Sequence, residues 1–225
     1  QDQLAGRAGR SIIVTAVSAR DRSRDRGIDI SGLTWYEDAR QLAKDDSLDV
    51  VVELIGGQGG VAKALVEKAI KAGKHVVTAN KALIAHHGTE LARAAEAKGL
   101  VLAYEAAVAG GIPIIKVLRE GLAANRIDRI YGILNGTCNY ILTDMAGSGC
   151  EFHEILQEAQ ELGYAEADPS FDVDGIDTAH KLAILAAVAF GHEVDFKNVY
   201  VEGIRHVSPI DIKFANELGY GIKLL

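Results

Sequence analysis

Five carboxylates and one lysine lie close together in residues 163–181, the stretch of the chain best equipped for chemistry. Pro169 marks a turn, and the pattern becomes helical from about Asp174 onward. Asp177 and Lys181 then stand four residues apart on one face of the predicted helix, so their side chains can touch. Such a pair can form part of a site that moves a proton or binds a charged ligand.

A capped helix with a surface Asp–Lys pair is the plain alternative, since such a pair stabilises a helix by only about 0.2–0.5 kcal/mol. Against this alternative, Lys181 stands at the start of the most apolar helical run of the chain, residues 181–190, where the lysine should be partly desolvated. A partly desolvated lysine can donate or accept a proton. Glu166 and Asp177 could also hold a substrate ammonium group. We therefore favour a substrate site.

Alternating strands and helices precede this stretch. Apolar runs predict strands at residues 11–17, 48–55, 74–78 and 100–104, the first of them buried on both faces. Helical spacing predicts helices at residues 36–44, 61–72 and 89–97. The alternation is typical of a doubly wound, Rossmann-type α/β fold, whose ligands bind beyond the carboxyl ends of parallel strands. Those ends are followed by Arg20, Gly56 and Gly57, Asn80 and Lys81, and Glu105.

After Pro113 the alternation weakens. The pattern predicts a helix at residues 114–122, a strand at 130–134 and a helix at 139–145. We expect two domains. Residues 1–110 form an incomplete doubly wound nucleotide-binding domain, and residues 111–225 form an α+β substrate-binding and dimerisation domain.

The segment from Gly57 to Ala62 matches G-x-G-x-x-A but is not the dinucleotide fingerprint. The fingerprint expects an acidic residue about 20 positions later, where this chain has Asn80 and Lys81. Residues 11–17 fit better as the second strand, with residues 1–10 as the tail of the first helix. The glycine loop would then precede residue 1, so we expect the chain to be a fragment.

Arginines 20, 22, 24 and 26 follow that second strand, where the 2′ position of a cofactor ribose would lie. Cationic side chains there favour the 2′-phosphate of NADP over NAD. The alternative is a charged loop exposed to solvent, which accounts for the presence of most of these arginines but not for Arg20.

Composition excludes several classes of function. A net charge of −7 argues against nucleic acid or an anionic membrane as the main partner, because both demand a basic face. No uncharged run approaches the roughly 18–20 residues of a membrane span. Cys138 and Cys150 lack CxxC spacing and the histidines lack metal-ligand spacing, so we predict no zinc site or disulfide and a reducing cytoplasm.

The spacing A-x3-G-Y-A-x2-D-P-x2-D-V-x-G-x-D-x3-K over residues 159–181 resembles the homoserine dehydrogenase signature at every fixed position. The resemblance continues through residues 53–57, 75–81, 105–113 and 135–140. It implies NAD(P)-dependent interconversion of L-homoserine and L-aspartate 4-semialdehyde, in threonine, methionine and isoleucine biosynthesis. It also implies a homodimer formed through the second domain.

The resemblance implies a role for each polar residue of the site. Lys181 would donate a proton to the carbonyl oxygen of aspartate semialdehyde as hydride arrives from the nicotinamide. Glu166 and Asp177 would bind the amino-acid end of the substrate, supported by Asp172. Lys81 would lie between cofactor and substrate.

The same resemblance implies that Gly57 and Gly163 line the cofactor. It also implies a monovalent-cation loop in which backbone carbonyls and one carboxylate bind sodium, and oxygen-only ligation suits such a hard cation. The loop residues are Glu105, Val108, Gly110 and Ile112.

Two other functions remain as alternatives. Cys138 at the start of a helix suits a cysteine-dependent semialdehyde dehydrogenase, in which a thiolate attacks the aldehyde. The signature at residues 159–181 has no place in such an enzyme. A non-catalytic binding remnant of the family is the second alternative, because the glycine loop and the later segments of the family are absent.

Overall fold

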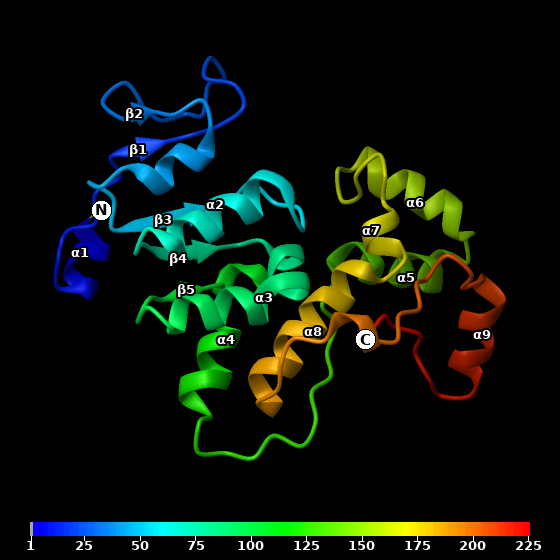
Figure 1. Cartoon of the computed structure of the whole chain (residues 1–225). Helices are drawn as coiled ribbons and strands as arrows, with labels where there is room; N and C mark the ends of the chain where they lie inside the picture. Colours follow the sequence, from blue (N-terminus) through cyan, green and yellow to red (C-terminus); the bar gives the residue numbers. More distant parts are fainter. Residues whose placement is uncertain (1) are drawn as a thin grey trace. The chain divides into compact units, whose positions relative to one another are not determined.

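The computed structural model describes residues 2–225, which divide into two compact units (Figure 1). The first unit runs to Leu83 and resumes over residues 87–104. The second comprises residues 84–86 and 105–225. No helix in the described part of the chain has the length and apolar character needed to cross a membrane.

A parallel three-stranded sheet forms the centre of the first unit. Its strands are β3 (Val50–Glu53), β4 (His75–Thr78) and β5 (Leu102–Ala103), in the order β3-β4-β5. Parallel neighbours need a crossover connection, which α2 (Gly60–Lys71) and α3 (Lys81–Glu96) supply. The predicted parallel α/β fold is therefore confirmed, although α3 begins eight residues before the helix that was expected at residue 89.

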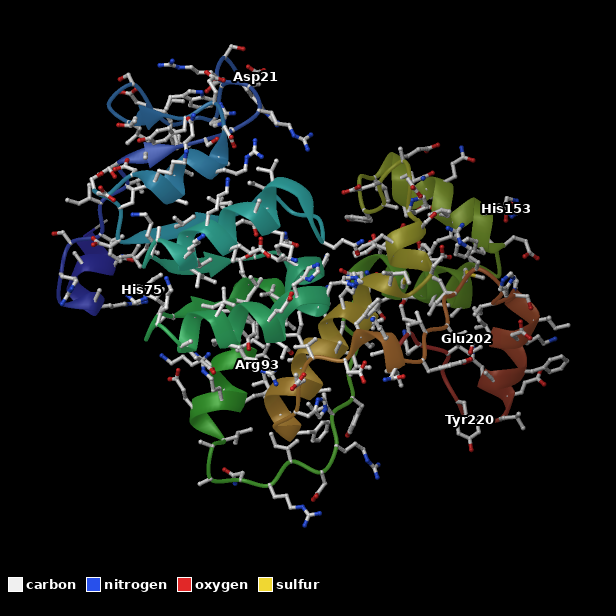
Figure 2. The ribbon with its side chains drawn as sticks, in the orientation of Figure 1. Asp21, His75, Arg93, His153, Glu202 and Tyr220 are labelled. Atoms are coloured by element: carbon white, nitrogen blue, oxygen red, sulfur yellow. The ribbon has the colours of Figure 1, made fainter. Side chains whose placement is uncertain are left out.

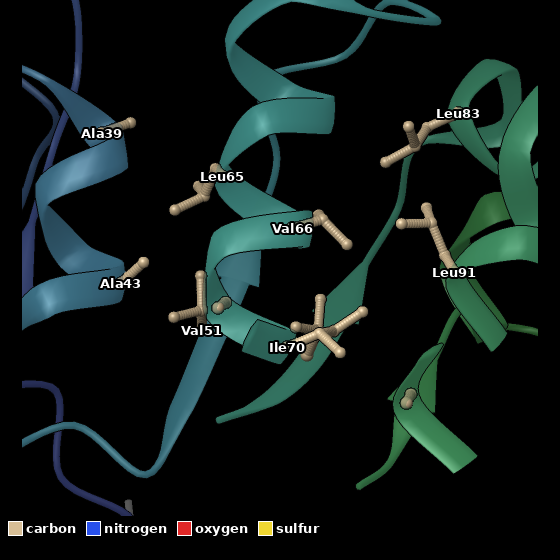
Figure 3. Close-up of a cluster of buried hydrophobic side chains, with 11 residues drawn as sticks. Ala39, Ala43, Val51, Leu65, Val66, Ile70, Leu83 and Leu91 are labelled. Carbon is tan, nitrogen blue, oxygen red and sulfur yellow. The ribbon is translucent and has the colours of Figure 1, made fainter. Parts of the chain in front are cut away.

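The core of this unit lies between α2, α3 and one face of the sheet. Figure 3 shows Leu65, Val66 and Ile70 of α2 close to Val51 of β3, with Leu83 and Leu91 of α3 in the same cluster. Burying such side chains contributes about 1.5–3 kcal/mol each. The side chains that alternate with Val51 point away from this core and are exposed, at 44% for Val50 and 57% for Val52.

Two expectations for the start of the chain are corrected. Of residues 11–17 only β1 (Ala16–Val17) forms a strand, paired in parallel with β2 (Thr34–Trp35). The preceding Ile12, Ile13 and Val14 are all more than half exposed, so this run is not buried on both faces. A strand requires a neighbour, and the hydrogen-bonded ladder begins only where Thr34 N donates to Thr15 O.

Short helices flank this pair of strands. The predicted helix over residues 36–44 is a 3₁₀ helix, η1 (Ala39–Lys44), which begins after the Asp38 cap. The expected helix tail is α1 (Asp2–Ala8), while Gln1 lies outside the described residues.

The second unit is built from helices. After η2 (Glu105–Ala107) come α4 (Ile114–Lys116), the π-helical turn η3 (Val117–Gly121), α5 (Gly136–Ser148), α6 (Phe152–Glu161), α7 (Ser170–Val173), α8 (Ile176–Phe190), η4 (Phe196–Asn198) and α9 (Pro209–Glu217). The strand expected over residues 130–134 is wrong, since the described residues of this unit contain no strand that could pair with it. Its core joins α5, α6, α7 and α9 through Ile141, Ile155, Val173 and Ile212.

Candidate active site

Asp177 and Lys181 lie on the first two turns of α8. Gly175 precedes the helix with a φ of 81°, a left-handed conformation that glycine adopts without steric cost. The chain can therefore turn sharply from α7 into α8. Asp177 is 2% exposed, so this carboxylate is buried at the start of the helix, where the helix dipole favours negative charge.

Lys181 is held by two hydrogen bonds. Its Nζ donates to Asp177 Oδ2 at 2.7 Å and to the carbonyl oxygen of Leu134 at 2.7 Å. The side chain of Lys181 is 16% exposed, so the predicted partial desolvation is confirmed. The ammonium group is therefore fixed between a carboxylate one turn away and a backbone carbonyl distant in sequence.

Asn135 links this pair to a second carboxylate. Its Nδ2 donates to Asp172 Oδ1 at 2.7 Å and to Asp177 Oδ2 at 3.0 Å. Its Oδ1 accepts a hydrogen bond from Cys138 N at 2.8 Å and caps α5. Asn135 is not among the site residues that the sequence predicts, although an asparagine just before a helix is a recognisable capping signal.

The five carboxylates of residues 163–181 have three kinds of surroundings in the structure: a shared amide, local structural partners and, for Glu166, solvent. Asp172 and Asp177 share the amide of Asn135. Asp174 pairs with Arg205, and a hydrogen bond from the Ser170 hydroxyl lowers the pKa of Asp168. These last two carboxylates stabilise the α7 region, which accounts for much of the charge density seen in the sequence.

Glu166 is exposed. Its backbone carbonyl accepts a hydrogen bond from Gln160 Nε2 at 2.9 Å. The hydrogen bonds described above for Asp172, Asp177 and Lys181 do not include the Glu166 carboxylate. Gly163 follows α6 with a φ of 77°, where only glycine turns the chain easily.

The carboxyl ends of β3 and β4 form a second polar region, within the first unit. Glu53 is fully buried, and its carboxylate accepts hydrogen bonds from Ile55 N at 2.6 Å and from Thr78 Oγ1 at 2.6 Å. Asn80 caps α3 and donates from Nδ2 to Gly57 O at 2.8 Å. These contacts hold the Gly57 loop beside the start of α3, where Lys81 is partly buried.

The arginine-rich loop follows β1, and Asp21 marks it in Figure 2. Arg22 and Arg26 both lie over the ring of Trp35, at 5.7 and 5.8 Å from its centroid. Arg26 also donates to two backbone carbonyls of the loop. These two arginines therefore have structural contacts, whereas Arg20 is exposed at the end of the strand.

The predicted cation loop begins at η2. Both carboxylate oxygens of Glu105 accept backbone N–H groups, from Ile115 at 2.7 Å and from Lys116 at 2.9 Å. This carboxylate thus caps the start of α4. Gly110 is left-handed, with a φ of 59°, so the loop turns there. Among residues 2–225 no group of three or more His, Cys, Asp or Glu side chains could hold a metal ion.

Cys138 is fully buried in the first turn of α5. Its Sγ donates to Asp172 O at 3.2 Å, and burial, aided by the nearby carboxylates, raises the pKa of the thiol to about 12. A catalytic thiolate needs a lowered pKa and access to substrate. The geometry therefore disfavours Cys138 as a nucleophile.

A parallel α/β unit with polar residues at the carboxyl ends of its strands, followed by a helical unit that holds a lysine among carboxylates, defines a two-unit protein of the nucleotide-binding α/β class. The family model described as homoserine dehydrogenase matches residues 113–225, and that described as homoserine dehydrogenase, NAD binding domain, matches residues 2–105. The chain belongs to the homoserine dehydrogenase family.

Individual relatives agree with this result. A homoserine dehydrogenase of Pseudomonas aeruginosa is 53% identical over 224 residues, which is 100% of this chain and 51% of the relative. The crystal structure of a homoserine dehydrogenase from Thiobacillus denitrificans superposes with a TM-score of 0.94 at 51% identity, over 99% of this chain and 51% of that one. The chain spans about half the length of these relatives.

A more distant solved structure contains a bound cofactor. A hyperthermophilic archaeal homoserine dehydrogenase in complex with NADPH superposes with a TM-score of 0.70 at 31% identity. The superposition covers 80% of this chain and 55% of that chain.

Proposed function

We propose that the protein containing this chain catalyses the NAD(P)-dependent interconversion of L-homoserine and L-aspartate 4-semialdehyde, as an oxidoreductase of threonine, methionine and isoleucine biosynthesis. The observation that carries the proposal is the Lys181 ammonium group, held at 2.7 Å by both Asp177 and Leu134 O. Membership of the homoserine dehydrogenase family supports the choice of reaction.

Lys181 is the proton donor to the carbonyl oxygen of the semialdehyde and the proton acceptor in the reverse direction. A positioned general acid of this kind contributes about 10²–10⁴-fold to a rate. The bound nicotinamide cofactor supplies or accepts the hydride. Because two hydrogen bonds already orient Lys181, little reorganisation is needed when a substrate oxygen takes the place of one partner.

Asp172 and Asp177 bind the substrate ammonium group. Glu166, which is exposed, contributes a third carboxylate to this binding. The two aspartates support this assignment because they are held close together on a shared amide beside Lys181. Glu166 rests on the resemblance alone. Its exposure is compatible with a side chain that takes up its contact when substrate binds.

Gly57 and Lys81 of the first unit bind the cofactor, and NADP is preferred over NAD. The cofactor role of Gly163 rests on the family resemblance alone. Arg20 supports the preference, because it is exposed at the end of β1 while Arg22 and Arg26 contact Trp35. The NADPH complex of the archaeal relative supports it further. Glu105, Val108, Gly110 and Ile112 hold sodium through backbone carbonyls and one carboxylate, as the family resemblance implies.

The protein acts in the cytoplasm as a homodimer formed through the domain proposed for residues 111–225. The dimer rests on the family resemblance, and the cytoplasmic location rests on the cysteine usage of the sequence. Sedimentation of the intact protein tests the dimer.

The activity is tested by following cofactor reduction by the intact protein with L-homoserine. Lys181→Ala should lower kcat by about 100- to 10,000-fold, as expected for loss of a general acid or base. Lys213→Ala, which alters an exposed Lys–Glu pair on α9, is the matched control and should keep full turnover. Undiminished turnover in Lys181→Ala would remove Lys181 from its role, and absence of homoserine-dependent reduction in the wild type would overturn the function.

A further inference from the structure

Asn135 is the residue that links the partly buried carboxylate of Asp172 to the buried carboxylate of Asp177. It is 5% exposed, and both ends of its amide are used. The oxygen accepts from Cys138 N, while the nitrogen donates to Asp172 and to Asp177. The preceding carbonyl, Leu134 O, accepts from Lys181. One dipeptide therefore contacts the proposed proton donor and both aspartates.

The orientation of this amide is determined by its partners. If its oxygen and nitrogen were exchanged, the NH2 group would face the N–H of Cys138 and the oxygen would face two carboxylates. Asparagine is one of few side chains that combine an acceptor with two donors. The two hydrogens of an amide NH2 point about 120° apart, so acceptors at 2.7 and 3.0 Å lie about 5 Å from each other. That separation suits an ammonium group between two carboxylates.

We propose that Asn135 is a positioning residue for substrate binding: its amide sets the separation and orientation of Asp172 and Asp177 and so shapes the pocket for the substrate ammonium group. This inference rests on the proposed function. Without the amide donors the two carboxylates repel each other, and Asp177 is free to turn fully toward Lys181. The affinity for the substrate is then lowered.

The test separates the capping role of Asn135 from its donor role. Asn135→Ser keeps an oxygen that can cap α5 but removes the amide donors. We expect the KM for L-homoserine to rise about tenfold or more, with kcat within about threefold and the KM for NADP unchanged. A merely structural role would lower the active fraction, which reduces kcat and leaves KM unchanged.

Asn139→Ser is the matched control, because Asn139 lies one turn further along α5 and contacts Lys223 near the surface. Its KM for L-homoserine should stay within about twofold of the wild type. An unchanged KM in Asn135→Ser, or an equal rise in Asn139→Ser, would overturn the inference. Turnover by the wild type tests the proposed function separately.

A second measurement does not depend on activity. Asn135→Ser and Asp177→Asn, alone and combined, are compared by urea unfolding of the intact protein. If the Asn135 amide holds the Asp177 carboxylate, the effects of the two substitutions are coupled. The fold-change in the unfolding equilibrium constant of the double variant then differs at least fivefold from the product of the fold-changes in the two single variants. Additive effects would contradict a direct positioning role.

Discussion

Asp177 and Lys181 form an ion pair with an Nζ–Oδ2 distance of 2.7 Å, and their side chains are only 2% and 16% exposed. Lys213 and Glu217 have the same four-residue spacing on α9, yet their charged atoms are 4.0 Å apart and both side chains are more than half exposed. The same sequence spacing therefore produces a buried polar network on one helix and a surface contact on the other.

Lys181→Met should lower the free energy of unfolding by about 3 kcal/mol, because it leaves the buried Asp177 carboxylate without its charged partner. Lys213→Met should change it by less than about 1 kcal/mol, as is usual for exposed pairs. Urea unfolding of both variants measures the difference. Equal effects would show that burial of the Asp177 pair has no energetic consequence.

Cys138 should resist alkylation in the native protein. Burial raises the pKa of this thiol to about 12, so it carries no thiolate at pH 8, whereas Cys150 is only partly buried. Iodoacetamide followed by mass spectrometry should label Cys150 first and Cys138 only after unfolding. Cys138→Ser should retain activity. Loss of activity in this variant, together with rapid labelling of Cys138 in the native protein, would instead support a thiolate mechanism.

Cys138 should also make stability depend on alkaline pH. Its pKa is raised from 9.0 to about 12 in the folded state, so the unfolded chain loses the proton first. The stabilising contribution is complete below pH 9 and is lost as the pH rises through about 12. Between pH 8 and 10.5, the urea midpoint of the wild type should fall more steeply than that of Cys138→Ser.

Gly203 should not tolerate a side chain. A Cβ there would lie 2.6 Å from Asp174 Cα and closer still to Val173 O, the acceptor for Ile204 N. Because these are backbone atoms, α7 would have to move. Gly203→Ala should cost about 3 kcal/mol of stability and impair activity. In Gly221→Ala the Cβ meets nothing within 4 Å, so its thermal midpoint should match the wild type.

Arg20→Gln should weaken NADP binding about tenfold and leave NAD binding nearly unchanged, since a charge-assisted hydrogen bond to the 2′-phosphate is lost. Fluorescence titration of each cofactor measures this. Arg22→Gln, at the arginine over Trp35, is the control in the same loop. Tighter binding of NAD than of NADP by the wild type would contradict the preference.

Local periodicity was enough to predict the strands β3 and β4, the helix α2 and the Asp177–Lys181 pair, because each depends on residues a few positions apart. Residues 11–15 of the strand expected over 11–17, and the whole strand expected over 130–134, failed to form for the opposite reason. A strand exists only with a neighbour, and apolar composition does not reveal whether one is present. The start of α3 was missed because its signal is the Asn80 cap rather than apolar spacing.

The signature at residues 159–181, read from the sequence alone, was sufficient to indicate the family and its lysine. Only the tertiary structure separated the carboxylates of residues 163–181 into those bonded to Asn135, those that stabilise the α7 region and the exposed Glu166. The tertiary structure also showed that Asn135 contacts two of these carboxylates, which lie 37 and 42 residues further along the chain. Folding α5 against α7 and α8 brings these groups within hydrogen-bond distance, and a linear pattern carries no information about that packing.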